Sequence, residues 1–260
     1  MIHYIVNLQT DKKSKYYHKF WEGIRKYTSN ISIVTLNYDT LLEQAFDFLY
    51  EKFGFIDYCT HLMNYDEIEE LKNYNFWVNP REPVKIKENT TPVPIKIIKL
   101  HGSLNWKYCN CCNQTLLTPW DRTIDLHKGK FLGYTYPDNE KYEYVCPLDG
   151  TEFQTLIMPP TYIKYLNQPV ISQLMSEASR EIRDAKKIIF IGYSLSDADV
   201  HIKALFRKQL RPDQEVIVVN NKKPKTLLNK YYAISRNMKY IKCSFEELVS
   251  DDKILKELIS

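Results

Sequence analysis

The stretch that decides the fold is Ile188-Ile189-Phe190-Ile191-Gly192-Tyr193-Ser194-Leu195-Ser196-Asp197. It places four apolar residues directly before a glycine and a polar run. A short, continuously apolar run of this kind is typical of a strand buried on both faces of a parallel sheet. The segment Val200–Leu210, which follows, has apolar residues at helical spacing. The stretch therefore predicts a strand, a polar turn and a covering helix.

The same order of strand and helix recurs along the chain. Further apolar strands are predicted at Ile31–Val34, Ile95–Leu100, Leu156–Met158, Val216–Val219 and Met238–Ile241. Helices are predicted at Thr40–Lys52, from Pro169 to Ala185, from Leu227 onward and from Phe245 onward. Short apolar strands that alternate with helices form a parallel sheet covered on both faces. We therefore expect an α/β fold with a doubly wound parallel sheet.

Composition limits the class of protein. The chain has 260 residues, 44% of them hydrophobic and 26% charged, which is enough for a sizeable core. A net charge of only +4 argues against a role in coating nucleic acid, and we interpret Lys12–Lys15 and Lys222–Lys225 as solvated faces. No apolar run approaches the roughly 18 residues of a membrane-spanning helix, and no signal peptide is visible. We expect a cytoplasmic protein with neither a membrane nor a nucleic-acid partner.

Two stretches depart from the strand–helix alternation. Tyr58–Pro94 is rich in Asn, Pro and charge, and Trp106–Phe153 carries four of the six Cys. Long loops without structure are uncommon in compact domains. We predict that residues 106–153 form a smaller inserted Cys-containing module within one domain spanning 1–260. A disordered insertion is the alternative.

Polar residues follow four of the predicted strands, at their carboxyl ends. The four segments are Thr35–Asp39, Lys99–Ser103, Gly192–Asp197 and Asn220-Asn221. Ligands of open α/β sheets bind beyond the carboxyl ends of the strands. We therefore expect the four segments to converge around a nucleotide, outside the core.

Each of these residues also has a purely structural interpretation. Asn37 is placed to cap the helix that starts near Thr40. Ser196 and Asp199 have the spacing of a capping box. A lone His after an apolar strand, such as His101, is more often hydrogen-bonded within the structure than catalytic. Only the joint pattern favours a ligand site.

Several motifs occur in the order and strand context found in the sirtuins. They are Thr35-Leu36-Asn37-Tyr38-Asp39, Leu100-His101-Gly102-Ser103, Pro159-Pro160-Thr161-Tyr162, Gly192-Tyr193-Ser194-Leu195-Ser196-Asp197, Val219-Asn220 and Cys243. The chain most closely resembles the divergent sirtuin-like domains of prokaryotic defence proteins, over roughly residues 31–249. The resemblance implies a Rossmann-like NAD-binding domain of the sirtuin type with a smaller inserted module. It also implies chemistry at the nicotinamide–ribose bond, with NAD as the substrate.

The resemblance implies two catalytic residues. His101 would act as a general base on a ribose hydroxyl, because a neutral imidazole is available at cellular pH. Asn37 would position the ribose and the water or acceptor, and Asp39 would hold the carboxamide.

The same resemblance assigns further residues to cofactor binding. Gly192 would let the backbone approach NAD, and Ser194 would offer donors to phosphate. Asn220 would bind the adenosine ribose. Cys243 would line the adenine pocket by its backbone, which is compatible with a small buried side chain.

Sirtuins carry two Cys-x-x-Cys pairs, and this chain departs from that pattern. Cys109 and Cys112 match the first pair, whereas Cys146 is followed by Asp149 in place of the fourth Cys. Zinc accepts carboxylate oxygen, so these four residues would make a tetrahedral site, with His127 as another donor. A site that has decayed and binds no zinc is the alternative.

A larger departure lies at the start of the chain. Sirtuin-like enzymes begin with a strand and a Gly-Ala-Gly-type loop that holds the pyrophosphate. Only 30 residues precede Ile31 here, and Gly23 is their single glycine. We expect an N-terminally incomplete domain, which is a fragment, a shortened product or a domain without catalysis. Such a chain would bind NAD weakly and associate with itself or with a partner protein.

The leading hypothesis from the sequence is an NAD hydrolase that releases nicotinamide and ADP-ribose in prokaryotic antiviral defence. An NAD-dependent protein deacylase is the first alternative, although no feature of the sequence is dedicated to an acyl-lysine peptide. A non-catalytic interaction module with a sirtuin-like fold is the second.

Overall fold

The structure is a computed structural model of the 260-residue chain. It describes residues 15–28, 30–47, 54–62, 93–117, 123–125, 130–132, 145–146, 148–158, 168–222 and 224–260. These residues fall into two compact units. Of the described residues, unit 1 contains 32–158 and 168–174, and unit 2 contains 15–31 and 175–260.

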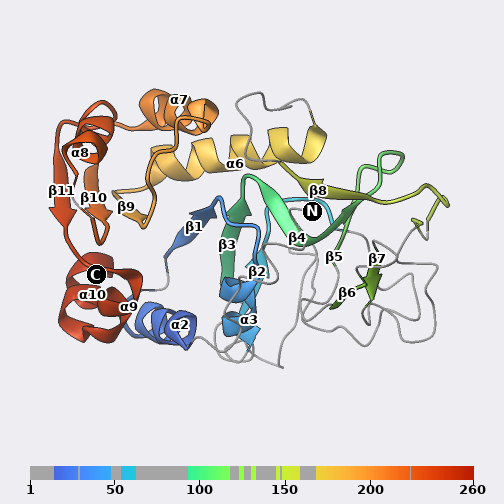
Figure 1. Cartoon of the computed structure of the whole chain (residues 1–260), viewed down its shortest axis with the longest axis horizontal. Coiled ribbons are helices and arrows are strands. Elements are labelled where there is room, and N and C mark those ends of the chain that lie inside the picture. Colours follow the sequence, from blue (N-terminus) through green and yellow to red (C-terminus); the bar gives the residue numbers. More distant parts are fainter. Residues whose placement is uncertain are drawn as a thin grey trace. The chain divides into compact units, whose positions relative to one another are not determined.

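Unit 1 contains a three-stranded parallel sheet with the order β1-β3-β2 (Figure 1). Its strands are β1 (Ser32–Thr35), β2 (Gly54–Asp57) and β3 (Val93–Lys99), and helix α3 (Leu41–Asp47) follows β1. The predicted strands at 31–34 and 95–100 are confirmed, whereas β2 was not predicted. Of the helix predicted at 40–52, residues 48–52 lie outside the described part.

Unit 1 also contains antiparallel strands, which the sequence did not indicate. A three-stranded sheet has the order β5-β4-β8, and β6 and β7 form a separate pair. Their bounds are β4 (Gly102–Tyr108), β5 (Thr115–Leu117), β6 (Thr123–Asp125), β7 (Lys130–Leu132) and β8 (Gln154–Ile157).

The strand predicted at Leu156–Met158 is therefore real but was assigned to the wrong kind of sheet. β8 pairs with β4 in antiparallel register, with Gly102 opposite Ile157. An apolar run reports burial and not the direction of the neighbouring strand, so the prediction of a parallel partner was wrong. The inserted module at 106–153 stays a prediction, because part of it lies outside the described residues.

Unit 2 contains a second parallel sheet, with the order β11-β10-β9. Its strands are β9 (Lys187–Ile191), β10 (Glu215–Val219) and β11 (Met238–Ile241). The helices are α2 (Tyr16–Tyr27), α6 (Pro169–Asp184, of which 175–184 belong to unit 2), α7 (Val200–Gln209), α8 (Lys225–Tyr232), α9 (Phe245–Ser250) and α10 (Asp252–Ile259). All three predicted strands of this half are confirmed.

The helical stretch predicted from Phe245 onward is confirmed and consists of two helices. The break falls at Asp251, whose Oδ1 accepts hydrogen bonds from the N–H groups of Lys253 (3.0 Å) and Ile254 (3.1 Å). A side chain that accepts from the first turn caps a helix N-terminus. Asp251 therefore starts α10 where the periodic apolar pattern alone would continue α9.

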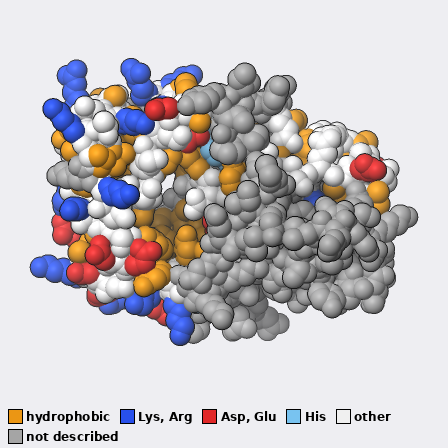
Figure 2. All heavy atoms as spheres, viewed as in Figure 1, with side chains coloured by type: hydrophobic (Ala, Val, Ile, Leu, Met, Phe, Trp, Pro, Cys, Tyr) orange, Lys and Arg blue, Asp and Glu red, His pale blue; other side chains and the backbone are white. Residues whose placement is uncertain are grey.

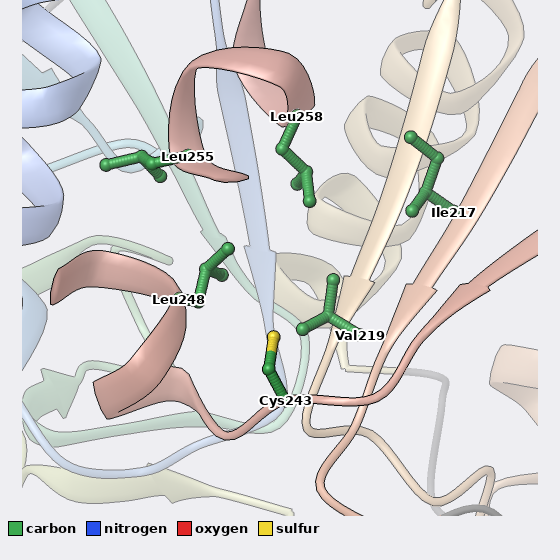
Figure 3. Close-up of a cluster of buried hydrophobic side chains, with 6 residues drawn as sticks. All are labelled: Ile217, Val219, Cys243, Leu248, Leu255 and Leu258. Carbon is green, nitrogen blue, oxygen red and sulfur yellow. The ribbon is translucent and has the colours of Figure 1, made fainter. Parts of the chain in front are cut away.

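The core of unit 2 joins β10 to the two C-terminal helices (Figure 3). Buried side chains that share this cluster are Ile217, Val219, Cys243, Leu248, Leu255 and Leu258. Helix α2 packs against the same helices, and its Gly23 makes a close approach possible. A Cβ at Gly23 would lie 2.2 Å from Leu255 Cδ2. This glycine therefore serves helix packing.

Mixed helices and parallel sheets confirm the α/β class. The doubly wound, Rossmann-type arrangement stays a prediction. In the described part of the chain, no helix combines the length and the apolar character needed to cross a membrane.

Charged side chains of both signs lie on the face drawn in Figure 2. Exposed ion pairs in unit 2 join Lys26 to Asp252 at 2.9 Å and Lys239 to Glu257 at 2.6 Å.

Gln214 generates a stability prediction for unit 2. Its side chain is 1% exposed, and its Nε2 donates to the carbonyls of Ile182 and Ala185, each at 2.6 Å. Gln214→Ala leaves these acceptors without that donor, so we expect the free energy of unfolding to fall by about 2 kcal/mol. Urea denaturation followed by circular dichroism measures the change. Gln209→Ala, at a half-buried helix position, is the control, and an equal loss in both variants would contradict this account.

Candidate functional site

The carboxyl ends of β1 and β3 lie side by side in unit 1. The Leu100 N–H donates to the Thr35 carbonyl at 3.1 Å, and the Leu104 N–H donates to the Tyr38 carbonyl at 2.9 Å. The rings of Tyr38 and His101 stack with their centroids 6.2 Å apart. The structure therefore brings together the two segments that carry Asn37, Asp39 and His101.

Asn37 lies at the surface of this site. It is exposed, and its backbone N–H donates to Thr35 Oγ1 at 3.1 Å. The neighbouring Asp39 accepts the Leu41 N–H on Oδ1 at 3.1 Å, so Asp39 provides the side-chain bond at the start of α3. The interpretation of Asn37 as the cap of this helix was therefore wrong.

His101 is buried, with 5% of its surface exposed. Its carbonyl accepts the Met158 N–H at 2.9 Å, and the Tyr38 hydroxyl donates to the Met158 carbonyl at 2.5 Å. The expectation that this residue lies outside the core was wrong. The reason is that β4 begins at Gly102, so His101 is held between two strands and not in an open loop.

A buried ion pair lies beneath the same segment. Lys99 Nζ is 2.7 Å from Glu43 Oε1, and both side chains are 1% exposed. Lys99 Nζ also donates to the Asp39 carbonyl at 2.5 Å. Burial raises the pKa of Glu43, and the Lys99 charge opposes that shift. This pair was not predicted, although a Lys at the end of an apolar strand was a visible signal.

Gly192, Ser194 and Asn220 follow neighbouring strands of unit 2. Gly192 has a left-handed φ of +68°, and its N–H donates to the Val219 carbonyl at 2.9 Å. Ser194 is exposed. Asn220 Oδ1 accepts the Lys222 N–H at 3.1 Å. Because β9 and β10 run parallel, their carboxyl ends meet at one edge of the sheet, where the three residues lie.

Asp199 has a different role from the one that its spacing indicated. Helix α7 begins at Val200, and Asp199 Oδ2 accepts the Tyr193 hydroxyl at 3.1 Å. Ser196 Oγ accepts the Ala198 N–H at 3.3 Å and does not cap the helix. The capping-box interpretation was therefore wrong. Burial raises the pKa of Tyr193, so its hydroxyl stays protonated as a donor.

The Cys243 side chain belongs to the apolar core of unit 2. It is 7% exposed and packs in the cluster drawn in Figure 3. Burial raises the pKa of its thiol, which disfavours the reactive thiolate. A ligand could use this residue only through its backbone, which is the role that the resemblance implied.

Cys109, Cys112, Cys146 and Asp149 form one cluster in unit 1. One ligand atom from each lies within 4.8 Å of all the others. Cys109 Sγ is 3.3 Å from Asp149 Oδ2, and Cys112 Sγ is 3.9 Å from Cys146 Sγ. His127 lies outside the described residues.

The cluster is built from two matching turns. In the first, the Asn113 N–H donates to the Cys109 carbonyl at 3.0 Å, and in the second the Gly150 N–H donates to the Cys146 carbonyl at 2.8 Å. Asn113 and Gly150 have left-handed φ values of +58° and +75°. Each turn therefore reverses the chain four residues after its first Cys.

This equivalence explains the fourth donor. Asp149 occupies in the second turn the position that Cys112 occupies in the first. Burial raises the pKa of Cys146 to about 12. A hydrogen bond from the Thr151 N–H, at 2.9 Å, is the main cause that lowers the pKa of Asp149 to about 2. Three sulfurs and one carboxylate can therefore offer zinc a tetrahedral donor set once the thiols lose their protons.

An α/β fold with polar residues at the carboxyl ends of parallel strands is the architecture of a nucleotide-binding domain. A family model described as SIR2-like domain matches residues 31–241. The chain therefore belongs to the SIR2-like domain family, which confirms the sirtuin-like resemblance. A comparison with curated proteins gave no match. The matched range includes every candidate residue except Cys243, and membership implies the use of NAD.

Two glycines of the site generate a paired prediction. A Cβ at Gly102 would lie 1.9 Å from the Leu156 carbonyl oxygen, whereas a Cβ at Gly192 would meet nothing within 4 Å. Both residues have positive φ. We expect Gly192→Ala to cost about 1 kcal/mol for its backbone conformation alone. Gly102→Ala has to break the contact of β4 with β8 as well, so the loss should be several-fold larger. Thermal unfolding measures both, and equal losses would contradict the role of the Leu156 contact.

Proposed function

We propose that this chain binds NAD and hydrolyses it to nicotinamide and ADP-ribose, with His101 and Asn37 as its catalytic residues. The observation that carries the proposal is the meeting of the β1 and β3 ends. Asn37 is exposed there, and the ring of its neighbour Tyr38 stacks on the buried His101. By its resemblance to defence proteins, the chain acts in prokaryotic antiviral immunity, in the cytoplasm.

The reaction breaks the bond between ribose C1′ and the nicotinamide nitrogen. Nicotinamide leaves with the electron pair of that bond, and positive charge develops on the ribose. His101 accepts a proton from a ribose hydroxyl, which stabilises that charge. Asn37 holds the water that adds to C1′. His101 then returns its proton to the ribose oxygen, and the one proton released by the water passes to solvent. Asp39 holds the nicotinamide carboxamide, for which it has a second carboxylate oxygen besides the one that accepts the Leu41 N–H.

The further NAD-binding residues that the resemblance assigns lie in unit 2, at Gly192, Ser194 and Asn220. Space for a Cβ at Gly192 is open, which supports a close approach of ligand to its backbone. The exposed Ser194 binds phosphate, and Asn220 binds the adenosine ribose. Cys243 contributes backbone alone, because its side chain is in the core.

Substitution of the two catalytic residues tests the proposal. We expect His101→Asn and Asn37→Ala each to lower the rate of nicotinamide release by about 10²-fold or more, since a positioned acid–base group contributes on that scale. His61→Asn and Asn30→Ala, both at exposed positions, are the matched controls. Thermal unfolding is recorded for each variant, because His101 is buried.

The same assay separates the alternatives. Retained turnover in both site variants would overturn the catalytic assignment. Nicotinamide release that requires an added acetylated peptide, together with transfer of the acetyl group to ADP-ribose, would favour a deacylase. Absence of both NAD binding and nicotinamide release would favour a non-catalytic interaction module.

We also propose that the two matching turns hold a structural zinc ion. Cys109, Cys112, Cys146 and Asp149 are its ligands. A bound zinc ion supplies no chemistry to the reaction here, but it ties together the two turns, which are far apart in the sequence. The half-buried thiol of Cys112 and the buried thiol of Cys146 become thiolates when the metal binds, so binding releases protons.

Metal analysis tests the zinc proposal. We expect about one zinc per chain in protein purified without chelator, and Asp149→Cys should retain it because sulfur is a good zinc ligand. Cys146→Ser should lose it. Cys111→Ser is the control, since Cys111 is exposed and lies in the turn from Cys109 to Asn113 but outside the four-residue cluster. Because protons compete for the thiolates, zinc retention should fall as the pH is lowered from 7 to about 5. No zinc in the unmodified chain would support a decayed site.

A further inference from the structure

We propose that Lys99 and Glu43 form a positioning pair that holds the Asn37–Asp39 segment against His101. The proposal rests on the function proposed above, because the segments that the pair holds carry the residues proposed as catalytic. Neither side chain touches the substrate. The pair acts through the backbone of Asp39, whose carbonyl is hydrogen-bonded to Lys99 Nζ.

The pair connects the two segments that carry the catalytic residues. Lys99 is the last residue of β3, two positions before His101. Glu43 lies in α3, four positions after Asp39. A single ammonium group bonded to both Glu43 Oε1 and the Asp39 carbonyl therefore fixes the loop between β1 and α3 relative to β3.

Burial makes a purely stabilising role a poor explanation. Each side chain is 1% exposed, so both charges have lost their hydration. The cost of that loss commonly equals or exceeds the attraction within the pair, and well-packed apolar residues are often as stable. What an apolar pair cannot do is donate a hydrogen bond to the Asp39 carbonyl. The distinct contribution of Lys99 is therefore to orient the backbone of Asp39 through this hydrogen bond.

Two backbone amides report on this arrangement through their hydrogen exchange, which does not depend on NAD hydrolysis. The Leu41 N–H donates to Asp39 Oδ1 at 3.1 Å, and the Leu104 N–H donates to the Tyr38 carbonyl at 2.9 Å. Both acceptors belong to the segment that Lys99 holds. Loss of the hydrogen bond from Lys99 to the Asp39 carbonyl should open these two hydrogen bonds before the β1–β3 ladder opens.

The test compares two double variants of the full chain. Lys99→Met with Glu43→Leu removes the buried pair, and Lys239→Met with Glu257→Leu removes an exposed pair with a 2.6 Å contact by the same chemical changes. Hydrogen exchange is measured at Leu41, at Leu104 and in β3. We expect exchange at the two reporter amides to rise by about 10-fold or more, with β3 unchanged, in the buried-pair variant alone.

Nicotinamide release provides the second measurement. We expect kcat to fall by about 10-fold or more in the buried-pair variant while KM stays within about 3-fold, because misplaced catalytic groups slow the chemical step. Glu43→Gln leaves an acceptor for Lys99 and the bond to Asp39, so it should stay near the unmodified chain in both measurements. A buried-pair variant that does not fold is replaced by Lys99→Met with Glu43→Gln, which also removes the donor to the Asp39 carbonyl and leaves no charge unpaired, and for which the same selective loss is expected.

The outcomes separate the two proposals. Unchanged exchange at Leu41 and Leu104 would overturn the positioning role, and so would an equal rise in exchange throughout unit 1, which indicates a merely structural role. A Glu43→Gln variant as impaired as the double variant would also overturn it. An unmodified chain that releases no nicotinamide would contradict the proposed function, whereas the exchange measurement would still decide the arrangement.

Discussion

Parallel pairing of β1 with β3 is the constraint on which the candidate site depends. Thr35 is paired with Lys99, so both strands end at the same level and the chain leaves the sheet in the same direction. The hydrogen bonds to the Thr35 and Tyr38 carbonyls then extend the contact past the strand ends. Residues far apart in the sequence meet there because the carboxyl ends of paired parallel strands lie at the same edge of the sheet.

Much of this arrangement was predictable, since strand and helix periods report burial directly. Continuous apolar runs located β1, β3, β9, β10 and β11, and helical spacing located α6 and α7. The direction of β8 and the break between α9 and α10 were not predictable in this way. The first depends on its partner β4, and the second on the side chain of Asp251 accepting backbone N–H groups where an apolar period would continue.

The features of the candidate site also divide into those that were predictable from the sequence and those that depend on tertiary contacts. Residue types at strand ends indicated Asn37 and His101, and the spacing of Cys and Asp indicated the four-donor cluster. The burial of His101 and of the Lys99–Glu43 pair was not indicated, because a charged or titratable residue at a strand end is normally solvated. Antiparallel β4, which starts directly after His101, removes the solvent that a loop there would admit.

One short segment, from Lys99 to Ser103, contains several departures from local rules. It contains a buried ammonium, a buried imidazole and a left-handed Gly102 whose Cβ position is blocked by the Leu156 carbonyl. The two buried polar groups are unfavourable by themselves, and the position of Gly102 admits no side chain. Natural sequences keep such local conflicts chiefly where function requires them. Such conflicts beside His101, within a SIR2-like domain, are consistent with the catalytic role proposed for this histidine.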